Sequence, residues 1–259
     1  MPSTEPHHII AIGASAGGME EIHHFFDNTP LDGVAYVIVQ HLSPDFKSRM
    51  VELLDKHSLL KVREAEENIL VEKNMVYLIP SNKIMTIEKS RLKLLEKTKT
   101  NGPHLTINTF FNSFAKDQGA KAIGVILSGM GSDGSDGVKA IKKAGGMIMV
   151  RDPEKSEFSS MPSNAIATGV ADFIMEPSAM PQTILDYTNN ISILALKVAA
   201  SKDDENKMHD IIELVKNHHP LDFTDYKSST ILRRIKRRAA YHHFDKLEGN
   251  CKNICYRCR

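Results

Sequence analysis

The sequence lacks the features that would place a protein in a membrane, outside the cell or in a fibre. None of its uncharged apolar runs approaches the ~18 to 20 residues of a membrane span, and Met1 to His8 lack the basic and apolar blocks of a signal peptide. Hydrophobic residues make up 41% of the 259 residues and charged residues 25%, which excludes disordered, collagen-like and coiled-coil chains. We therefore expect a globular cytoplasmic protein with no membrane insertion.

Cysteine is absent from the first 250 residues, and all three cysteines lie in the last nine, at Cys251, Cys255 and Cys258. Their C-x-x-x-C-x-x-C spacing is that of a radical S-adenosylmethionine iron–sulfur site, but such a site needs a surrounding barrel. Because the composition also changes abruptly after about Leu247, we interpret residues 248–259 as an aberrant tail, with reduced thiols that have no function.

Charge is distributed unevenly along a chain whose net charge is only +1. Residues 201–259 carry 13 Lys and Arg against 9 Asp and Glu, so a basic tail follows a mildly acidic body. Five of the six residues 233–238 are Lys or Arg, within a helix that Ser228 or Ser229 could cap. Such a helix attracts anionic surfaces or nucleic acids weakly, and we expect no specific nucleic-acid partner.

From His8 to about Tyr187, short apolar runs alternate with segments of helical period, as in HHIIAIG followed by GMEEIHHFF. This alternation predicts an α/β fold with parallel strands and crossover helices. Between Met75 and Glu96, two strand-like halves flank a polar turn at residues 88–90, which predicts an added antiparallel hairpin. After Tyr187 the strand pattern disappears, and residues 206–218 have helical spacing.

The first candidate for chemistry is Ser15, in the segment IIAIGASAGG. It lies at the carboxyl end of an expected strand, and residues 13–17 match the G-x-S-x-G pattern of a nucleophile elbow. Backbone N–H groups at the start of the next helix, around Ala16 and Gly17, could stabilise an oxyanion. The alternatives are a phosphate-binding glycine loop or a tight structural turn, although neither G-x-G-x-x-G nor the P-loop pattern is present.

A nucleophilic serine needs a base, and His41 follows the second expected strand, Val34 to Val39. The carboxyl ends of neighbouring strands face a common crevice in a doubly wound sheet. Of the twelve histidines only His41 has this placement; its alternative role is that of a hydrogen-bonded structural residue.

Two carboxylates, Asp133 and Asp136, follow a third expected strand in the loop LSGMGSDGSDG. One of them could orient His41 and stabilise its protonated form, as the acid of a catalytic triad does. The alternative is helix capping, for which Asp136 is well placed. A calcium loop is a further alternative, but the ligand spacing of an EF-hand is absent.

Together these motifs resemble the catalytic domain of the chemotaxis protein-glutamate methylesterases, the CheB family. The resemblance rests on IGASAGG, VIVQHLSP, LSGMGSDGSDGVKAIKKAGG and MPSNAIATG, in this order. It implies a doubly wound, Rossmann-like, mostly parallel sheet with an added antiparallel hairpin, and a triad of Ser15, His41 and Asp133. It also implies that Met130 lines the site and that neither a metal nor an organic cofactor is needed. Ala16 stands where the family often has threonine.

Residues 221–244 resemble the start of the helical N-terminal domain of the chemotaxis methyltransferases, the CheR family, in which a basic helix contributes to receptor recognition. We therefore expect a methylesterase domain, a linker helix region, a partial CheR-type all-α segment and the aberrant tail, at residues 8–187, 188–219, 220–247 and 248–259. This order resembles esterase–methyltransferase fusions, and we expect a truncated fusion that lacks a phosphoacceptor receiver domain and does not bind S-adenosylmethionine.

The resemblance implies hydrolysis of glutamate γ-methyl esters on cytoplasmic chemoreceptor helices, with methanol as product, and deamidation of glutamine through the same acyl intermediate. The expected partners are a methylated chemoreceptor or receptor-like signalling protein, and a separate methyltransferase. Two alternatives remain. One is a nucleotide-binding or dehydrogenase domain, although the acidic residue it needs after the second strand is replaced by His41. The other is a non-catalytic, receptor-binding remnant of the fusion.

Overall fold

The computed structural model describes residues 5–40, 49–97 and 105–198, without the side chains of residue 49 and residues 190–198. The chain divides into two compact units, Met1–Gln182 and Thr183–Arg259. The strands are β1 (Ile9–Ala14), β2 (Ala35–Gln40), β3 (Lys61–Glu64), β4 (Ile69–Leu70), β5 (Met75–Leu78), β6 (Lys83–Glu88), β7 (Arg91–Glu96), β8 (Ile123–Ile126), β9 (Met147–Arg151) and β10 (Phe173–Met175). The α-helices are α1 (Gly18–Phe26), α2 (Arg49–Asp55), α3 (Thr106–Gln118), α4 (Ser135–Lys143), α5 (Ser160–Ala167) and α6 (Met180–Val198), and the 3₁₀ helices are η2 (Gly119–Lys121), η3 (Pro153–Lys155) and η4 (Pro177–Ala179).

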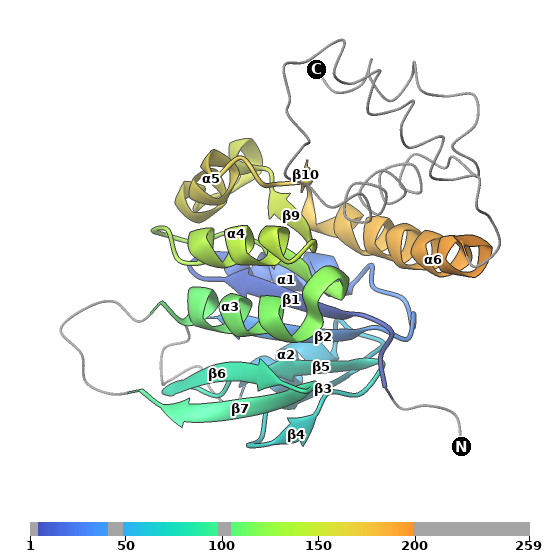
Figure 1. Cartoon of the computed structure of the whole chain (residues 1–259). Coiled ribbons are helices and arrows are strands. Elements are labelled where there is room, and N and C mark those ends of the chain that lie inside the picture. Colours follow the sequence, from blue (N-terminus) through green and yellow to red (C-terminus); the bar gives the residue numbers. More distant parts are fainter. Residues whose placement is uncertain (1–4, 41–48, 98–104, 199–259) are drawn as a thin grey trace, which may run out of the picture. The chain divides into compact units, whose positions relative to one another are not determined.

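The first unit is built on a parallel sheet of seven strands in the order β10-β9-β8-β1-β2-β5-β3 (Figure 1). β1 lies inside the sheet, with β2 on one side and β8 on the other. From β1 the chain adds β2, then β3 at the far edge and β5 between them, and it later returns to add β8, β9 and β10 on the opposite side of β1. This reversal makes the β1/β8 boundary a topological switch point, where α/β proteins commonly place their sites.

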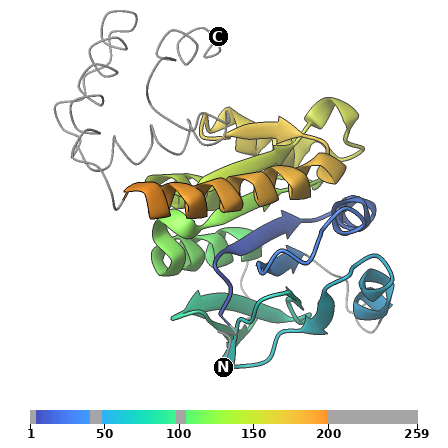
Figure 2. The same ribbon diagram turned by 90° about the vertical axis from the view of Figure 1, so that its right-hand side faces the viewer.

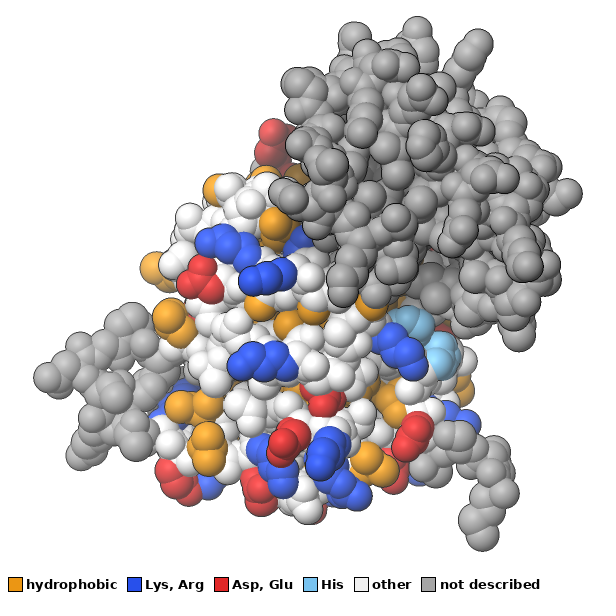
Figure 3. All heavy atoms as spheres, in the orientation of Figure 1, with side chains coloured by type: hydrophobic (Ala, Val, Ile, Leu, Met, Phe, Trp, Pro, Cys, Tyr) orange, Lys and Arg blue, Asp and Glu red, His pale blue; other side chains and the backbone are white. Residues whose placement is uncertain are grey.

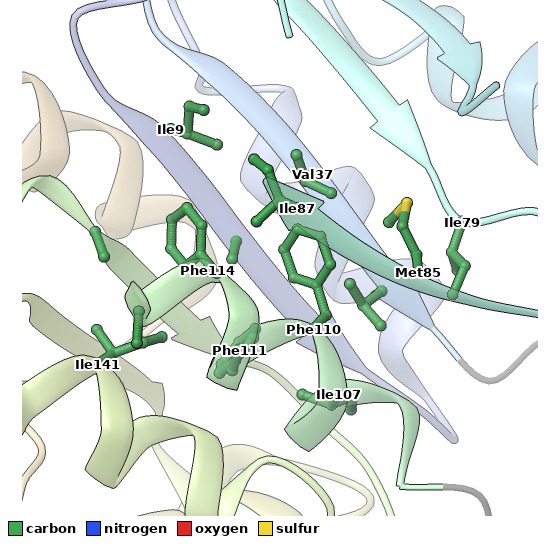
Figure 4. Packing of buried hydrophobic residues seen from close by; sticks show 14 of the residues in the cluster. Ile9, Val37, Ile79, Met85, Ile87, Ile107, Phe110, Phe111, Phe114 and Ile141 are labelled. Atoms are coloured by element: carbon green, nitrogen blue, oxygen red, sulfur yellow. The ribbon is translucent and has the colours of Figure 1, made fainter. Parts of the chain in front are cut away.

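The central strands form because their residues are apolar and bury both faces. Every residue of β1 and β2 is buried, as expected for strands covered by helices on each side. Alternate side chains, such as Ile9 and Val37, point to the face covered by α3 and β6 (Figure 4). On the other face, Tyr36 packs edge-on against two phenylalanines of α1, with ring centroids 5.8 Å and 5.3 Å apart.

The expected antiparallel hairpin is present, but it is shorter than predicted. β6 and β7 pair through residues 83–96 and form a separate small sheet with β4, whereas Met75–Leu78 is a parallel strand of the main sheet. Figure 2 shows the hairpin strands, in teal, apart from the blue β1. Lys89 and Ser90 turn the hairpin with positive φ angles of 51° and 57°, and their backbone N–H groups donate to the carboxylate of Asp117 on α3.

The outer surface of the hairpin is polar. Acidic and basic side chains are interspersed over this part of the molecule (Figure 3), and Lys83 forms an ion pair with Glu96 across the two strands. Opposite charges facing each other across a strand pair favour this register.

Helix α6 crosses the boundary between the two units. It begins at Met180, before the expected end of the first domain at residue 187, and runs into the expected linker region. No helix in the described ranges is long and apolar enough to cross a membrane. The CheR-like segment and the cysteines lie outside the described residues.

Candidate active site

Ser15 lies in the turn between β1 and α1, at the carboxyl end of the strand as predicted. Its backbone N–H donates to the carbonyl of Ser128, 2.9 Å away, and its carbonyl accepts from Gly18 N at 3.0 Å, which closes the turn. Gly17 caps α1 with φ at +71°, a left-handed conformation that glycine adopts without steric cost. The Ser15 side chain is half-buried, so it remains accessible while its backbone is held.

The turn is close to the loop that follows β8. A Cβ atom built on Gly129 would lie 2.9 Å from the Cβ of Ser15, and one built on Gly17 would lie 2.6 Å from the ring of Phe158. Both positions therefore favour glycine, because a side chain would push the Ser15 turn away from the loop after β8 and from Phe158, which lies between η3 and α5. The small residues that the sequence indicated as a tight turn also allow these close contacts.

His41 lies outside the described residues, but the strand before it is described. β1 and β2 are parallel neighbours, and Ala14, the last residue of β1, pairs with Gln40, the last residue of β2. Ser15 and His41 are thus the residues that directly follow two neighbouring strands, and these strands end in register.

Asp133 is buried, with 7% of its surface exposed, and its carboxylate accepts two backbone hydrogen bonds from the first turn of α3. Oδ2 accepts from Ile107 N and Oδ1 from Asn108 N, both at 2.9 Å. These N–H groups have no partner within their own helix, and the positive end of the helix dipole stabilises a carboxylate there. The loop after β8 therefore holds a carboxylate in a fixed direction, and this carboxylate caps α3 rather than the helix that follows the loop.

The helix that begins near Asp133, α4, is capped in return from α3. Asn108 Oδ1 accepts hydrogen bonds from Gly134 N at 3.0 Å and Gly137 N at 2.8 Å. The alternative in which Asp136 caps α4 is wrong: α4 has no side-chain cap of its own, and the Asp136 side chain is exposed and pairs with Lys139 Nζ at 3.0 Å. The amide oxygen of Asn108 thus accepts the N–H groups at the start of α4, which a side chain just before the helix would otherwise have to do.

Backbone donors lie on both loops next to Ser15. Within the part of the chain that the structure describes, the N–H groups of Ala16, Gly17 and Met130 have no hydrogen-bond acceptor. The residues on either side of Met130 are both held, because Gly129 N donates to Phe158 O at 3.0 Å and Gly131 N to Ser160 Oγ at 2.8 Å. Unpaired N–H groups next to a serine hydroxyl are the groups that can bind a developing oxyanion.

A buried ionic network lies behind the Ser15 turn, and the sequence had given no indication of it. Glu21 on α1 accepts hydrogen bonds from the backbone and the hydroxyl of Ser128 and from Arg151, each at 2.7 Å. These residues are 107 and 130 positions from Glu21 in sequence, so no local pattern marks the contacts.

The described residues contain no group of three or more His, Cys, Asp or Glu side chains able to hold a metal ion. Ser15 supplies a hydroxyl at this site, Asp133 supplies a buried carboxylate, and the two loops supply backbone N–H donors.

Family comparison matches residues 10–184 to CheB methylesterase, and residues 206–249 to the all-alpha domain of CheR methyltransferase. The protein-glutamate methylesterase/protein-glutamine glutaminase of Salmonella typhi is 34% identical over 181 residues, which cover 68% of this chain and 52% of that protein. The protein of the same name from Pyrococcus horikoshii is 32% identical over 189 residues, 71% of this chain and 51% of its own length. The chain thus spans about half the length of these curated relatives.

Two further proteins extend the comparison. An uncharacterized 104.1 kDa protein of Rhodobacter capsulatus is 32% identical over 211 residues, covering 73% of this chain and 22% of that protein. The crystal structure of the Thermotoga maritima CheB methylesterase catalytic domain superposes with a TM-score of 0.64 at 29% identity, and the match covers 69% of this chain and 97% of that one. The mostly parallel sheet and the small antiparallel sheet therefore match a solved CheB catalytic domain.

Proposed function

The chain belongs to the CheB methylesterase family, and on this premise we propose that it hydrolyses glutamate γ-methyl esters on a methylated chemoreceptor or receptor-like signalling protein. The names of its relatives also include protein-glutamine glutaminase, and we extend the proposal to deamidation of glutamine side chains. Both reactions cleave a bond at the same γ-carbonyl, so one acyl-enzyme serves both.

In the proposed mechanism, Ser15 Oγ attacks the ester carbonyl while His41 removes the hydroxyl proton. The tetrahedral intermediate collapses with breakage of the bond to the methoxy oxygen, which takes the proton from His41 and leaves as methanol. Water then attacks the acyl-enzyme and loses a proton to His41. The bond between the acyl carbon and Ser15 Oγ breaks, His41 returns its proton to Oγ, and the glutamic acid product ionises to the carboxylate.

The observation that carries the proposal is the position of Ser15 at the switch point of the sheet, beside a strand that ends in register with its own. Neighbouring strands lie about 4.8 Å apart, which supports His41 as the base. The N–H groups of Ala16, Gly17 and Met130 are the proposed oxyanion donors.

Asp133 is the proposed acid of the triad, orienting His41 through its carboxylate. Its two bonds to the α3 backbone support this role, because they fix the direction of the carboxylate and stabilise its charge. A carboxylate oxygen can accept more than one hydrogen bond, so bonding to α3 leaves capacity for an imidazole N–H.

The test is methanol release from a methylated receptor fragment by the whole chain and by Ser15→Ala. We expect the variant to lose about 10³-fold or more of the rate, because the covalent step is removed. Ser163→Ala, at an exposed serine of α5, is the matched control and should retain the wild-type rate. Unchanged methanol release by Ser15→Ala would disprove the nucleophile assignment. A wild-type chain that binds the receptor without releasing methanol would support the non-catalytic alternative.

A further inference from the structure

Glu21 is a buried carboxylate that the proposed mechanism does not use. It lies one turn into α1, and 8% of its surface is exposed. Oε2 accepts from the backbone N–H of Ser128 and Oε1 from the Ser128 hydroxyl, both at 2.7 Å. The Glu21 carboxylate therefore binds both the backbone N–H and the hydroxyl of Ser128, in the loop after β8.

Arg151, the last residue of β9, supplies the countercharge. Its Nε donates to Glu21 Oε1 at 2.7 Å, its Nη2 donates to the carbonyl of Lys155 at 2.6 Å, and its Nη1 lies 2.7 Å from a carboxylate oxygen of Glu176. Burial disfavours the charged form of Arg151, but the bonds to Glu21 and Glu176 outweigh it and raise its pKa above the usual value. The guanidinium group thus joins α1 to η3 and to Glu176, the residue that follows β10.

This network is connected to the proposed nucleophile through Ser128. The N–H and hydroxyl of Ser128 bind Glu21, and its carbonyl accepts the N–H of Ser15 at 2.9 Å. The chain of contacts runs from Arg151 through Glu21 and Ser128 to the backbone of Ser15. It ties together the carboxyl ends of β1, β8 and β9.

A buried ion pair contributes little net stability compared with apolar residues of the same volume, because both charges must lose their water. What this pair supplies is a fixed geometry for the peptide against which Ser15 rests. We propose that Glu21 and Arg151 are positioning residues for Ser15, a role that rests on the proposed function. Neither side chain touches the reacting atoms; both act through Ser128.

The consequence of loosening the network is a misplaced nucleophile with an intact binding surface. Misplacement of a reacting group by about 1 Å can cost about 10²-fold in rate. The loss should fall on the chemical step, because the surface residues that would meet substrate, such as Met130, are not part of the network.

The experiment measures labelling of Ser15 by a fluorophosphonate probe in the whole chain at several pH values, separating the maximal rate from the probe concentration at half-maximal rate. Methanol release and the thermal unfolding midpoint are measured in parallel. The variants are Glu21→Gln, which keeps the shape but removes the charge, and Arg151→Lys, which keeps the charge but loses the fork.

The matched control is Asp172→Asn. Asp172 also forms an ion pair, with Lys142, and also accepts a backbone hydrogen bond, from Ile148 N at 2.9 Å. Ile148 is near the start of β9, whereas Arg151 is at its end. The Asp172–Lys142 pair therefore lies at the amino ends of the parallel strands, and Ser15 lies at their carboxyl ends. The control therefore loses the same kind of interaction away from the nucleophile.

We expect Glu21→Gln and Arg151→Lys to lower the maximal labelling rate about 10- to 100-fold. The half-maximal concentration and the midpoint of the pH profile should stay as in the wild type, and Asp172→Asn should label at the wild-type rate. If Glu21→Gln does not fold, Arg151→Lys carries the test alone. Wild-type labelling by a folded Glu21 or Arg151 variant, or an equal loss in Asp172→Asn, would overturn the positioning role. Absence of labelling in the wild-type chain would instead contradict the proposed function.

Discussion

Asp133 caps a helix, and we propose that it also belongs to the triad, so the two roles that the sequence analysis treated as alternatives need not exclude each other. Its carboxylate binds the first turn of α3, and the proposed triad uses the same carboxylate to orient His41. Asp136, three residues later, does not cap a helix; its side chain is exposed and pairs with Lys139. Residue type and spacing could not separate the two aspartates, since both precede a helix. The direction in which each side chain points separates them.

We predict that Asp133→Asn loses both stability and activity. An asparagine amide offers one acceptor oxygen where two N–H groups of α3 need one each, so the free energy of unfolding should fall by about 1 to 3 kcal/mol. Methanol release should fall by about 10³- to 10⁴-fold, because the base loses its orienting charge. Urea unfolding and the methanol assay measure the two effects.

The control for this prediction is Asp136→Asn, which removes an exposed ion pair and should change the free energy of unfolding by less than about 0.5 kcal/mol. A folded Asp133→Asn protein with the wild-type rate would reduce Asp133 to a capping residue.

Gly17 and Gly169 allow the cost of a side-chain contact to be separated from that of the backbone conformation. They share a left-handed backbone but differ in the atoms that surround them. Their φ angles are +71° and +72°, whereas a Cβ at Gly17 would meet Phe158 at 2.6 Å and one at Gly169 would meet nothing within 4 Å. We predict that Gly169→Ala costs about 1 to 2 kcal/mol for the left-handed backbone. Gly17→Ala should cost more, because Phe158 must also move. Equal losses in urea unfolding would show that the Phe158 contact carries no strain.

At the scale of elements, α3 and α4 stabilise each other's beginnings. Asp133, just before α4, binds the N–H groups of α3, and Asn108 in α3 binds those of Gly134 and Gly137. Neither helix begins with a side-chain cap of its own. The pairing explains why the loop before α4 has a defined shape despite its glycines. Asp133 in this loop and Ser15 both lie at the carboxyl ends of the parallel strands.

Helix α1 carries an interaction that responds to pH. The imidazole of His23 stacks on that of His57, which follows α2, with centroids 4.1 Å apart and planes at 9°. Burial, then the charge of His57, lowers the pKa of His23 from 6.5, while Asp27 and Glu20 oppose the shift and His24 adds to it. The folded state therefore prefers neutral His23. Its contribution to stability is complete above about pH 6.5 and is lost as the pH falls through the lowered pKa.

We predict that the free energy of unfolding falls less between pH 7 and pH 5 in His23→Gln than in the wild type. The exposed neighbour supplies the control: His24→Gln should retain most of the wild-type pH dependence, because His24 contributes less to the shift than burial and His57 do. Urea unfolding at several pH values measures the difference. Identical slopes for wild type and His23→Gln would contradict the lowered pKa.

At the scale of the whole molecule, the chain joins a domain of the methylesterase family to a segment that matches the all-alpha domain of CheR methyltransferase. The mildly acidic body and the basic tail follow this division. Chemoreceptor helices that carry glutamates are acidic, so we propose that the basic residues 233–238 attract the substrate and leave the chemical step to Ser15.

We predict that the double variant Arg233→Gln/Arg234→Gln raises KM for methanol release from a methylated receptor fragment by about tenfold at low salt. Labelling of Ser15 by the fluorophosphonate probe should not change. The matched control, Arg257→Gln/Arg259→Gln, removes two positive charges from residues 248–259, outside the CheR-like segment, and should leave KM unaltered. An equal rise in both variants would indicate a general effect of net charge.

Features that depend on neighbours along the chain could be predicted from the sequence: the alternation of apolar runs and helices, the turn of small residues at Ser15, and the order of the motifs that resemble CheB. Strand and helix periods and tight turns are local properties, so they can be read from short windows. Which distant groups meet is apparent only in the folded molecule. It placed Asp133 on the N-terminus of α3, separated the hairpin from β5, and joined Glu21 to Ser128 and Arg151, 107 and 130 residues away. Such contacts depend on how buried polar groups find partners once the sheet is assembled, and no local pattern records that pairing.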